Sequence, residues 1–182
     1  MTYENTFLTK NGKECLIRAL ARGDGRITYD NFNQTHAESA EFLLSYADEN
    51  TFTPEREAEI LDEWLQSDVD AELGAFVDGV LVGTAGIHPI GRKDKVRHRC
   101  EFGVSVLKAY HGLGIGKALT EACTECAKSA GFLQIELDVV AQNEIAVSLY
   151  KKLGFTEFGR NNYGFRTREG VRQAILLMKK EI

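Results

Sequence analysis

Apolar and polar residues along the chain follow two spacings, and each spacing predicts one kind of element. Short apolar runs or period-two alternation that end at glycine or aspartate predict strands, and apolar residues three and four positions apart predict helices. Asp78 and Gly79 lie between two apolar runs, as the turn of a β-hairpin does. Thr53 followed by Pro54 is a favourable helix start. The predicted elements are, in order, strand 14–21, helices 36–47 and 53–66, strands 73–77, 80–87 and 99–106, helix 115–130, strand 134–140, helix 144–153, and two strands that flank residues 168–170.

This succession predicts one α/β domain that occupies residues 1–182. Its order is β-α-α-β-β-β-α-β-α-β-β, which we expect to form a mixed sheet with helices on both faces. The chain has only 2 prolines and no low-complexity linker, so its composition marks no boundary between domains.

The charge and the N-terminal residues narrow the classes of protein to consider. A formal net charge of -5 argues against a nucleic-acid partner, because nucleic-acid binders usually carry a basic face. No apolar run approaches the length needed to cross a membrane. The first residues lack the basic start and apolar stretch of a signal peptide. We therefore expect a cytoplasmic protein that binds neither nucleic acid nor membrane.

The 4 cysteines include Cys123 and Cys126, which have the C-x-x-C spacing of redox pairs and zinc sites. Both fall inside the predicted helix 115–130, away from the helix start where a thiolate is stabilised. No second pair of cysteines or histidines supplies further zinc ligands, and the 4 histidines are scattered. We therefore expect buried cysteines without redox or metal chemistry, and no metal site.

A glycine-rich turn between strand 99–106 and helix 115–130 is the strongest functional signal. Gly112, Gly114 and Gly116 occupy alternate positions. Glycines so placed let the backbone wind closely, so that successive N–H groups point inward. The helix that follows adds unpaired N–H groups and a partial positive charge. The turn should therefore bind an anion, and a pyrophosphate fits it best.

Three phosphate-binding patterns can be compared with this turn. The P-loop pattern fails at His111 and Ala118, and the dinucleotide pattern fails at Lys117. The pattern [RQ]-x-x-G-x-[GA] matches Gly114 and Gly116, with His111 in the Arg/Gln position. In this pattern the turn resembles the GNAT superfamily of N-acetyltransferases, whose loop cradles the pyrophosphate of coenzyme A.

The resemblance covers residues 70–180. Val104-Ser105-Val106 looks like the family's strand that pairs with the pantetheine arm, and residues 137–155 resemble its second signature. Lys108 departs from the pattern, because many members have proline there, and His111 departs from Arg or Gln while leaving the role of its backbone N–H intact. The resemblance implies the GNAT fold with splayed parallel central strands, acetyl-CoA as acyl donor without a metal, and N-acetyltransferase activity. The cofactor-binding residues it implies are Val104, Ser105, Val106, His111, Gly112, Leu113, Gly114, Ile115, Gly116, Lys117, Asn143 and Tyr150.

The reaction requires a neutral amine to attack a thioester directly. A lysine-like amine with a pKa of ~10.4 is neutral to about one part in 2,500 at pH 7, a penalty of ~4.6 kcal/mol. A general base relieves that penalty, and an acid protonates the departing thiolate. Tyr150 resembles the family's general acid, and its alternative role is a core aromatic on a short helix. Asn143 resembles the asparagine that binds coenzyme A, and it can cap the following helix as well.

Glu101 is the candidate base, because related enzymes often carry a glutamate on this strand. Alternation places it on the same side as Gly103 and Ser105. Burial among apolar neighbours would raise its pKa and suit it to accept a proton near neutral pH. Pairing with Arg97 or Arg99 would instead lower that pKa. The sequence leaves both alternatives open, and water remains a third candidate for the base.

The identity of the acceptor is open. Residues 38–72 are strongly acidic, with Arg56 as the one basic residue, which favours either a cationic amine of a small molecule or protein, or a solvated helical face. Residues 92–99 form a basic patch that could meet an acidic partner or serve solubility. The edge left by the final strands could pair to form a homodimer. A non-catalytic module that senses acyl-CoA is the alternative function, and acyl groups longer than acetyl also remain open.

Overall fold

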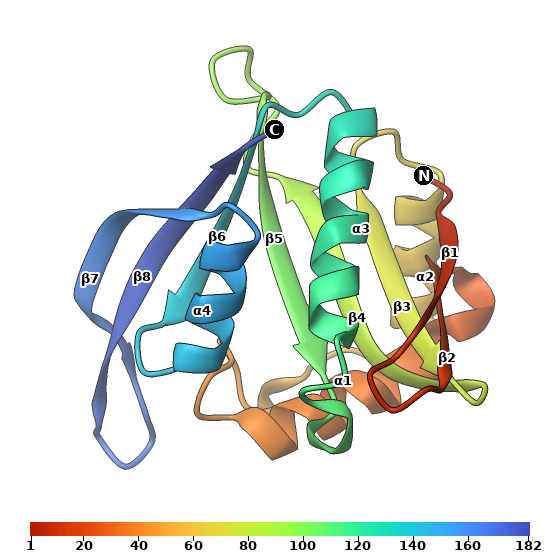
Figure 1. Ribbon diagram of the computed structural model, residues 1–182, viewed down its shortest axis with the longest axis horizontal. Coiled ribbons are helices and arrows are strands. Elements are labelled where there is room, and N and C mark those ends of the chain that lie inside the picture. Colours follow the sequence, from red (N-terminus) through yellow and green to blue (C-terminus); the bar gives the residue numbers. More distant parts are fainter.

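The computed structural model describes residues 1–182 and has an α/β architecture built on one mixed sheet (Figure 1). This confirms the predicted fold class. The strands and helices are β1 (Glu4–Leu8), β2 (Glu14–Ala19), α1 (Gly25–Ser39), α2 (Pro54–Leu65), β3 (Ala71–Val77), β4 (Val80–Pro89), β5 (Arg99–Val106), α3 (Ile115–Ser129), β6 (Gln134–Val140), α4 (Glu144–Lys152), β7 (Thr156–Arg166) and β8 (Arg172–Glu181). Three short 3-10 helices join them: η1 (Arg22–Asp24), η2 (Ala47–Glu49) and η3 (Lys108–Tyr110).

The sheet has 8 strands in the order β1-β2-β3-β4-β5-β6-β8-β7. Figure 1 shows α3 and α4 in front of the sheet, with α1 and α2 on its other side. The main core lies between α3 and the sheet and contains Leu73, Ile87 and Leu119, all fully buried. A smaller cluster packs Leu61 of α2 against Phe76. Because alternate residues of a strand face opposite sides, Glu72 beside Leu73 belongs to the α1/α2 face.

One pair of neighbouring strands, β5 and β6, is parallel. It is joined in register at Arg99–Gln134, Cys100–Ile135 and Glu101–Glu136, and nowhere beyond. In Figure 1 the two strands visibly diverge toward the ends to which their arrows point. The splayed parallel strands that the family resemblance implied are therefore present.

The hairpin turn, the start of α2 and the burial of the cysteines are as predicted. Asp78 and Gly79 both have positive φ angles, 52° and 77°, as a type I′ hairpin turn requires. Thr53 caps α2, since its side chain accepts a hydrogen bond from the Arg56 N–H. All four cysteines are free and buried, and burial raises the pKa of the Cys126 thiol to about 11. None of the helices combines the length and the apolar character that spanning a membrane requires.

Two predictions about the N-terminal part are wrong. β1 was missing from the predicted order, and the first helix begins at Gly25 and ends at Ser39 instead of spanning residues 36–47. The helix escaped detection because its buried positions are polar. Asn31 donates a hydrogen bond from its side chain to the Leu81 carbonyl at 3.0 Å. Leu44, part of the apolar spacing that suggested the later helix, is 84% exposed.

Gly25 should be essential to the packing of α1 against α2. A side-chain carbon at Gly25 would lie 2.5 Å from the Ala58 side chain, whereas one at Gly23 would meet nothing within 4 Å. We expect Gly25→Ala to lower the free energy of unfolding by about 1–3 kcal/mol, since overpacked contacts force the backbone to shift. Gly23→Ala should change it by less than ~0.5 kcal/mol. Denaturant unfolding of the two variants checks this, and equal stabilities would contradict the close packing.

Candidate active site

A row of unpaired backbone N–H groups lies where β5 leads into α3. The N–H groups from Gly112 to Lys117 donate to no acceptor in the protein, whereas the next one, of Ala118, bonds to the Gly114 carbonyl at 3.0 Å. Such N–H groups at a helix start attract an anion, because they combine unused donors with the positive end of the helix dipole. This row is the most direct structural sign of a ligand site in the molecule.

The glycines of the loop keep the row open. Gly112 and Gly114 have φ angles of 78° and 94°, in the left-handed region that favours glycine. A side-chain carbon at either position would meet no protein atom within 4 Å, so the space above the loop is free. Gly116 lies in the first turn of α3, with Leu149 of α4 at 3.8 Å from the position of such a carbon. The Lys10 N–H fixes the loop from the other side by bonding to the Leu113 carbonyl at 3.1 Å.

His111 differs from the prediction made for it. Its backbone N–H already donates to the Lys108 carbonyl at 3.2 Å, inside the turn of η3, so that group is not part of the open row. Its ring Nε2 lies 2.8 Å from the Val106 carbonyl and donates to it. His111 therefore ties the loop to the end of β5, and the expectation of an intact backbone role was wrong. The row of unpaired N–H groups therefore begins one residue later, at Gly112.

The gap between β5 and β6 leads to this loop. Past Glu101 the edge of β5 that faces β6 has no ladder partner, so the backbone groups of Val104 and the N–H of Val106 are free for another extended chain, while the Val106 carbonyl accepts from the His111 ring. On the α3 side, Phe102 is buried and lies edge-on to Tyr150, with ring centroids 6.3 Å apart. Tyr150 and Phe155 are 5.7 Å apart. Free backbone groups of β5 thus form one edge of the gap, and aromatic rings lie on its α3 side.

Tyr150 and Asn143 both belong to α4, at its end and at its start. Tyr150 is 8% exposed, its hydroxyl hydrogen-bonds to no other residue, and burial raises its pKa to about 12. Asn143 caps α4, since its side-chain oxygen accepts from the Ala146 N–H at 3.2 Å. Both alternatives that the sequence left open for Asn143 remain compatible, because the cap uses the oxygen and leaves the amide NH₂ free. Tyr150 packs in the core, as expected of a core aromatic. Its hydroxyl has no protein partner, as the role of general acid would require.

Neither alternative left open for Glu101 is present, since it is neither buried among apolar neighbours nor paired with Arg97 or Arg99. Glu101 is exposed. Arg99 instead pairs with Glu136, with Nη2 at 2.7 Å from Oε2 and a second hydrogen bond from Nε. Arg97 pairs with Asp94. Arg99 holds the pKa of Glu136 below its usual range by hydrogen bonding. Glu101 therefore stands free on the α1/α2 face, in register with His88 on one side and Glu136 on the other.

Most of the acidic residues from 38 to 72 lie on the solvated surface and pair with other groups of the protein. Asp48 forms two hydrogen bonds with Arg168 of the β7–β8 hairpin, at 2.6 and 2.8 Å. Glu38 accepts from the Lys108 N–H at 2.8 Å. Two members of the segment, Glu57 and Glu72, have raised pKa values because burial disfavours their charged forms. Glu72 was not singled out among the acidic residues of the sequence, since its burial depends on packing between α2 and the sheet.

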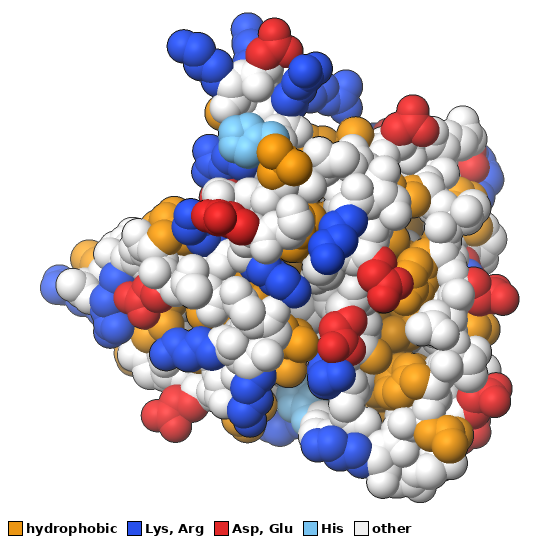
Figure 2. Space-filling model, turned by 45° about the horizontal axis from the view of Figure 1, so that its top comes forward, with side chains coloured by type: hydrophobic (Ala, Val, Ile, Leu, Met, Phe, Trp, Pro, Cys, Tyr) orange, Lys and Arg blue, Asp and Glu red, His pale blue; other side chains and the backbone are white.

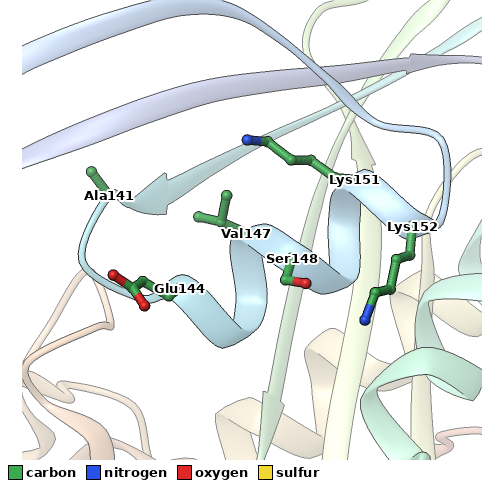
Figure 3. Close-up of a pocket in the computed structure, with 6 residues that line it drawn as sticks. All are labelled: Ala141, Glu144, Val147, Ser148, Lys151 and Lys152. Atoms are coloured by element: carbon green, nitrogen blue, oxygen red, sulfur yellow. The ribbon is translucent and has the colours of Figure 1, made fainter.

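Two further surface features lie outside the row of unpaired N–H groups. Figure 3 shows a pocket of about 520 Å³ along α4, with Glu144 at its start and Lys151 and Lys152 at its end. None of its lining residues belongs to the open row of N–H groups. Figure 2 shows Lys and Arg side chains gathered on the loop between β4 and β5, which projects from the molecule. This loop carries the basic patch of residues 92–99.

Comparison with known proteins agrees with this geometry. The family described as Acetyltransferase (GNAT) family matches residues 35–155, about two thirds of the chain. The chain therefore belongs to the GNAT acetyltransferase family. Among solved structures it resembles a GNAT-family acetyltransferase from Streptococcus pneumoniae, with a TM-score of 0.88 and 29% identity over 92% of this chain and 99% of that one. It shares its fold with yncA of Salmonella typhimurium, solved with its cofactor acetyl-CoA, with a TM-score of 0.80 and 20% identity over 97% and 94% of the two chains.

Curated relatives match over shorter stretches. The N-alpha-acetyltransferase RimI of Mycobacterium tuberculosis is 32% identical over 52% of this chain and 57% of its own. The ribosomal protein bS18-alanine N-acetyltransferase of Escherichia coli is 35% identical over 42% of this chain and 51% of its own. The chain thus spans about half the length of these relatives.

Gly114→Ala separates the ligand role of the loop from backbone strain. Gly131, at the other end of α3, has a similar φ of 80° and equally open surroundings, so Gly131→Ala is the matched control. Both variants should lose about 1 kcal/mol or more of unfolding free energy, because alanine is strained at positive φ. Only Gly114→Ala should weaken acetyl-CoA binding, by tenfold or more in a calorimetric titration, since its methyl group enters the open space above the loop. Equal affinities of the two variants would contradict the assignment.

Proposed function

We propose that the protein is an N-acetyltransferase that transfers the acetyl group of acetyl-CoA to a primary amine of a small molecule or protein. The observation that carries this proposal is the row of unpaired N–H groups from Gly112 to Lys117 beside the gap between β5 and β6. A pyrophosphate suits that row because each phosphate oxygen can accept several hydrogen bonds. The free edge of β5 suits the pantetheine arm, which carries amide groups. Family membership and the relatives named N-acetyltransferases support the same reading.

The residues beside the gap have the chemistry that direct transfer needs. Tyr150 retains its proton at neutral pH, because burial raises the pKa of its hydroxyl to about 12. It can therefore give a proton to the coenzyme A sulfur as the thiolate departs. Glu101 stands free on the face that the acceptor would approach, and it or water would accept the proton of the amine. Carboxylates on this face, among them Glu101 and Asp138, favour a cationic amine over a neutral or acidic acceptor.

A screen for release of the coenzyme A thiol tests the proposal. Purified protein with acetyl-CoA is offered spermidine, an aminoglycoside, free amino acids, and peptides with a free N-terminus. We expect release with at least one class of amine and a mass increase of one acetyl group on that amine. Binding of acetyl-CoA without release from any amine would favour the acyl-CoA-sensing alternative. Absence of acetyl-CoA binding would contradict both functions.

Tyr150→Phe should lower turnover while leaving acetyl-CoA affinity nearly unchanged. Removing a general acid costs about 10²–10⁴-fold in rate, and phenylalanine preserves the packing against Phe102 and Phe155. The loss should be constant from pH 6 to 10, because the wild-type hydroxyl, with a pKa of about 12, is protonated throughout. Tyr163→Phe, at an exposed position on β7, is the control and should retain full rate. A rate for Tyr150→Phe equal to that of the control would exclude the acid role.

A further inference from the structure

Glu72 lies in a setting unusual for a carboxylate. It stands on β3 between two fully or almost fully buried core residues, Ala71 and Leu73, and faces the α1/α2 side of the sheet. Its side chain is 15% exposed, and no lysine or arginine pairs with it. Burial, and then the nearby Glu57 of α2, raise the pKa of Glu72 to about 8, while the Thr84 hydroxyl lowers it by hydrogen bonding.

The Glu72 carboxylate extends across β4 toward the gap. In the sheet register, Glu72 lies opposite Gly86, and Gly86 lies opposite Gly103 on β5. A side-chain carbon at Gly86 would overlap the carboxylate oxygen of Glu72, so the carboxylate rests directly over that position. Strands lie about 4.8 Å apart, so one further strand spacing separates the carboxylate from Gly103.

Gly103 is the second residue beyond the last pair of β5 and β6, and the protein itself does not require glycine there. Its φ angle is not positive, and a side-chain carbon would meet nothing within 4 Å. Glycine inside a strand weakens it and often marks close approach of a ligand. The empty position beside the gap is therefore free for an acceptor amine, with the Glu72 carboxylate one strand away.

We propose that Glu72 receives the proton of the acceptor amine, directly or through one water, across the positions of Gly86 and Gly103; this inference rests on the proposed function. Glu72 takes one proton from the ammonium, and the freed nitrogen lone pair forms the C–N bond to the acetyl carbon. Tyr150 gives its hydroxyl proton to the sulfur as the C–S bond breaks. The second proton that the nitrogen sheds returns to the Tyr150 oxygen. The ammonium, thioester and carboxylate thus become an amide, a thiol and a carboxylic acid, and solvent removes the proton from Glu72.

The groups around Glu72 are compatible with this role. Glu57 faces it from α2, and its negative charge helps to keep Glu72 ready to accept a proton. On β4, His88 Nε2 lies 4.0 Å from the Glu72 carboxylate, and its Nδ1 is held by Asp70 at 3.0 Å. Cys123 of α3 lies on the opposite face of the sheet, where burial keeps its thiol protonated. Exposed Glu101, in register with His88, then attracts the ammonium, and Glu72 takes the role of proton acceptor that was assigned above to Glu101 or water.

Glu72→Gln tests the role without changing the size of the side chain. Wild type, Glu72→Gln and Glu101→Gln are assayed from pH 6 to 10 with spermidine and with a peptide that begins with alanine. Glu72→Gln should reduce kcat/KM at pH 7 by about 10²-fold or more, the size of a general-base contribution, and Glu101→Gln by less than tenfold. With spermidine, wild-type kcat/KM should level off above about pH 8, whereas that of Glu72→Gln should keep rising toward the pKa of the amine. Glu14→Gln, on the exposed end of β2, is the control and should match wild type.

A stability measurement separates this role from a structural one. The folded protein holds a proton on Glu72 that the unfolded chain releases above its ordinary pKa, so stability should fall as pH rises from about 5 to 9. In Glu72→Gln the loss of stability with rising pH should be smaller, so this variant should be more resistant to denaturant than wild type at pH 9.

A second variant, Gly103→Ala, should fold with unchanged stability yet lose tenfold or more in kcat/KM, because its methyl group occupies the space for the amine.

The outcomes distinguish this inference from the proposed function. Thiol release by wild type with unchanged activity in Glu72→Gln, or in Gly103→Ala, would overturn the role of Glu72 and leave the acetyltransferase function standing. A larger loss in Glu101→Gln than in Glu72→Gln would do the same. No release by wild type with any amine of the screen described above, despite bound acetyl-CoA, would overturn both.

Discussion

The candidate site depends on the point at which β5 stops pairing with β6. Arg99 and Glu136 join the two strands beside their last paired position with two hydrogen bonds, and beyond Glu101 the ladder ends. The next residue, Phe102, packs its side chain against Tyr150 and Phe155. A parallel ladder held on one side of this point and opened on the other leaves a strand edge free inside the sheet. Edges of that kind are costly unless another chain covers them, and an extended amide-bearing arm is suited to do so.

The same divergence positions the loop that precedes α3. β5 ends at Val106, whose carbonyl accepts the His111 ring N–H, so the loop starts from a fixed point. Left-handed glycines at Gly112 and Gly114 then turn the chain into the helix without a side chain above the backbone. The result is a set of N–H groups that neither the helix nor the loop satisfies. Such donors, beside a free strand edge and at the positive end of a helix, are suited to a phosphate group.

Much of the fold and the loop could be predicted from the sequence because these features are local. The Asp78-Gly79 turn, the Thr53-Pro54 helix start and the glycine spacing each act within a few residues, and no distant contact changes them. The first helix could not be found, since its buried face is polar and is satisfied by a distant carbonyl of β4. The surroundings of Glu101 could not be predicted for a related reason: exposure of a strand residue depends on which helices cover that part of the face. Glu72 remained hidden because only the register of β3 with β4 and β5 aligns it with two glycines.

The central claim, that the open N–H row binds the pyrophosphate of acetyl-CoA, is most directly tested by NMR titration of the backbone amides. Protein labelled with ¹⁵N is titrated with acetyl-CoA, and the shift of each amide proton is followed. The account predicts large downfield shifts for the amides from Gly112 to Lys117, because they gain charged acceptors, together with smaller changes at Val104 and Val106 on the free edge of β5. Binding that leaves these amides unmoved and shifts those of another surface would contradict it.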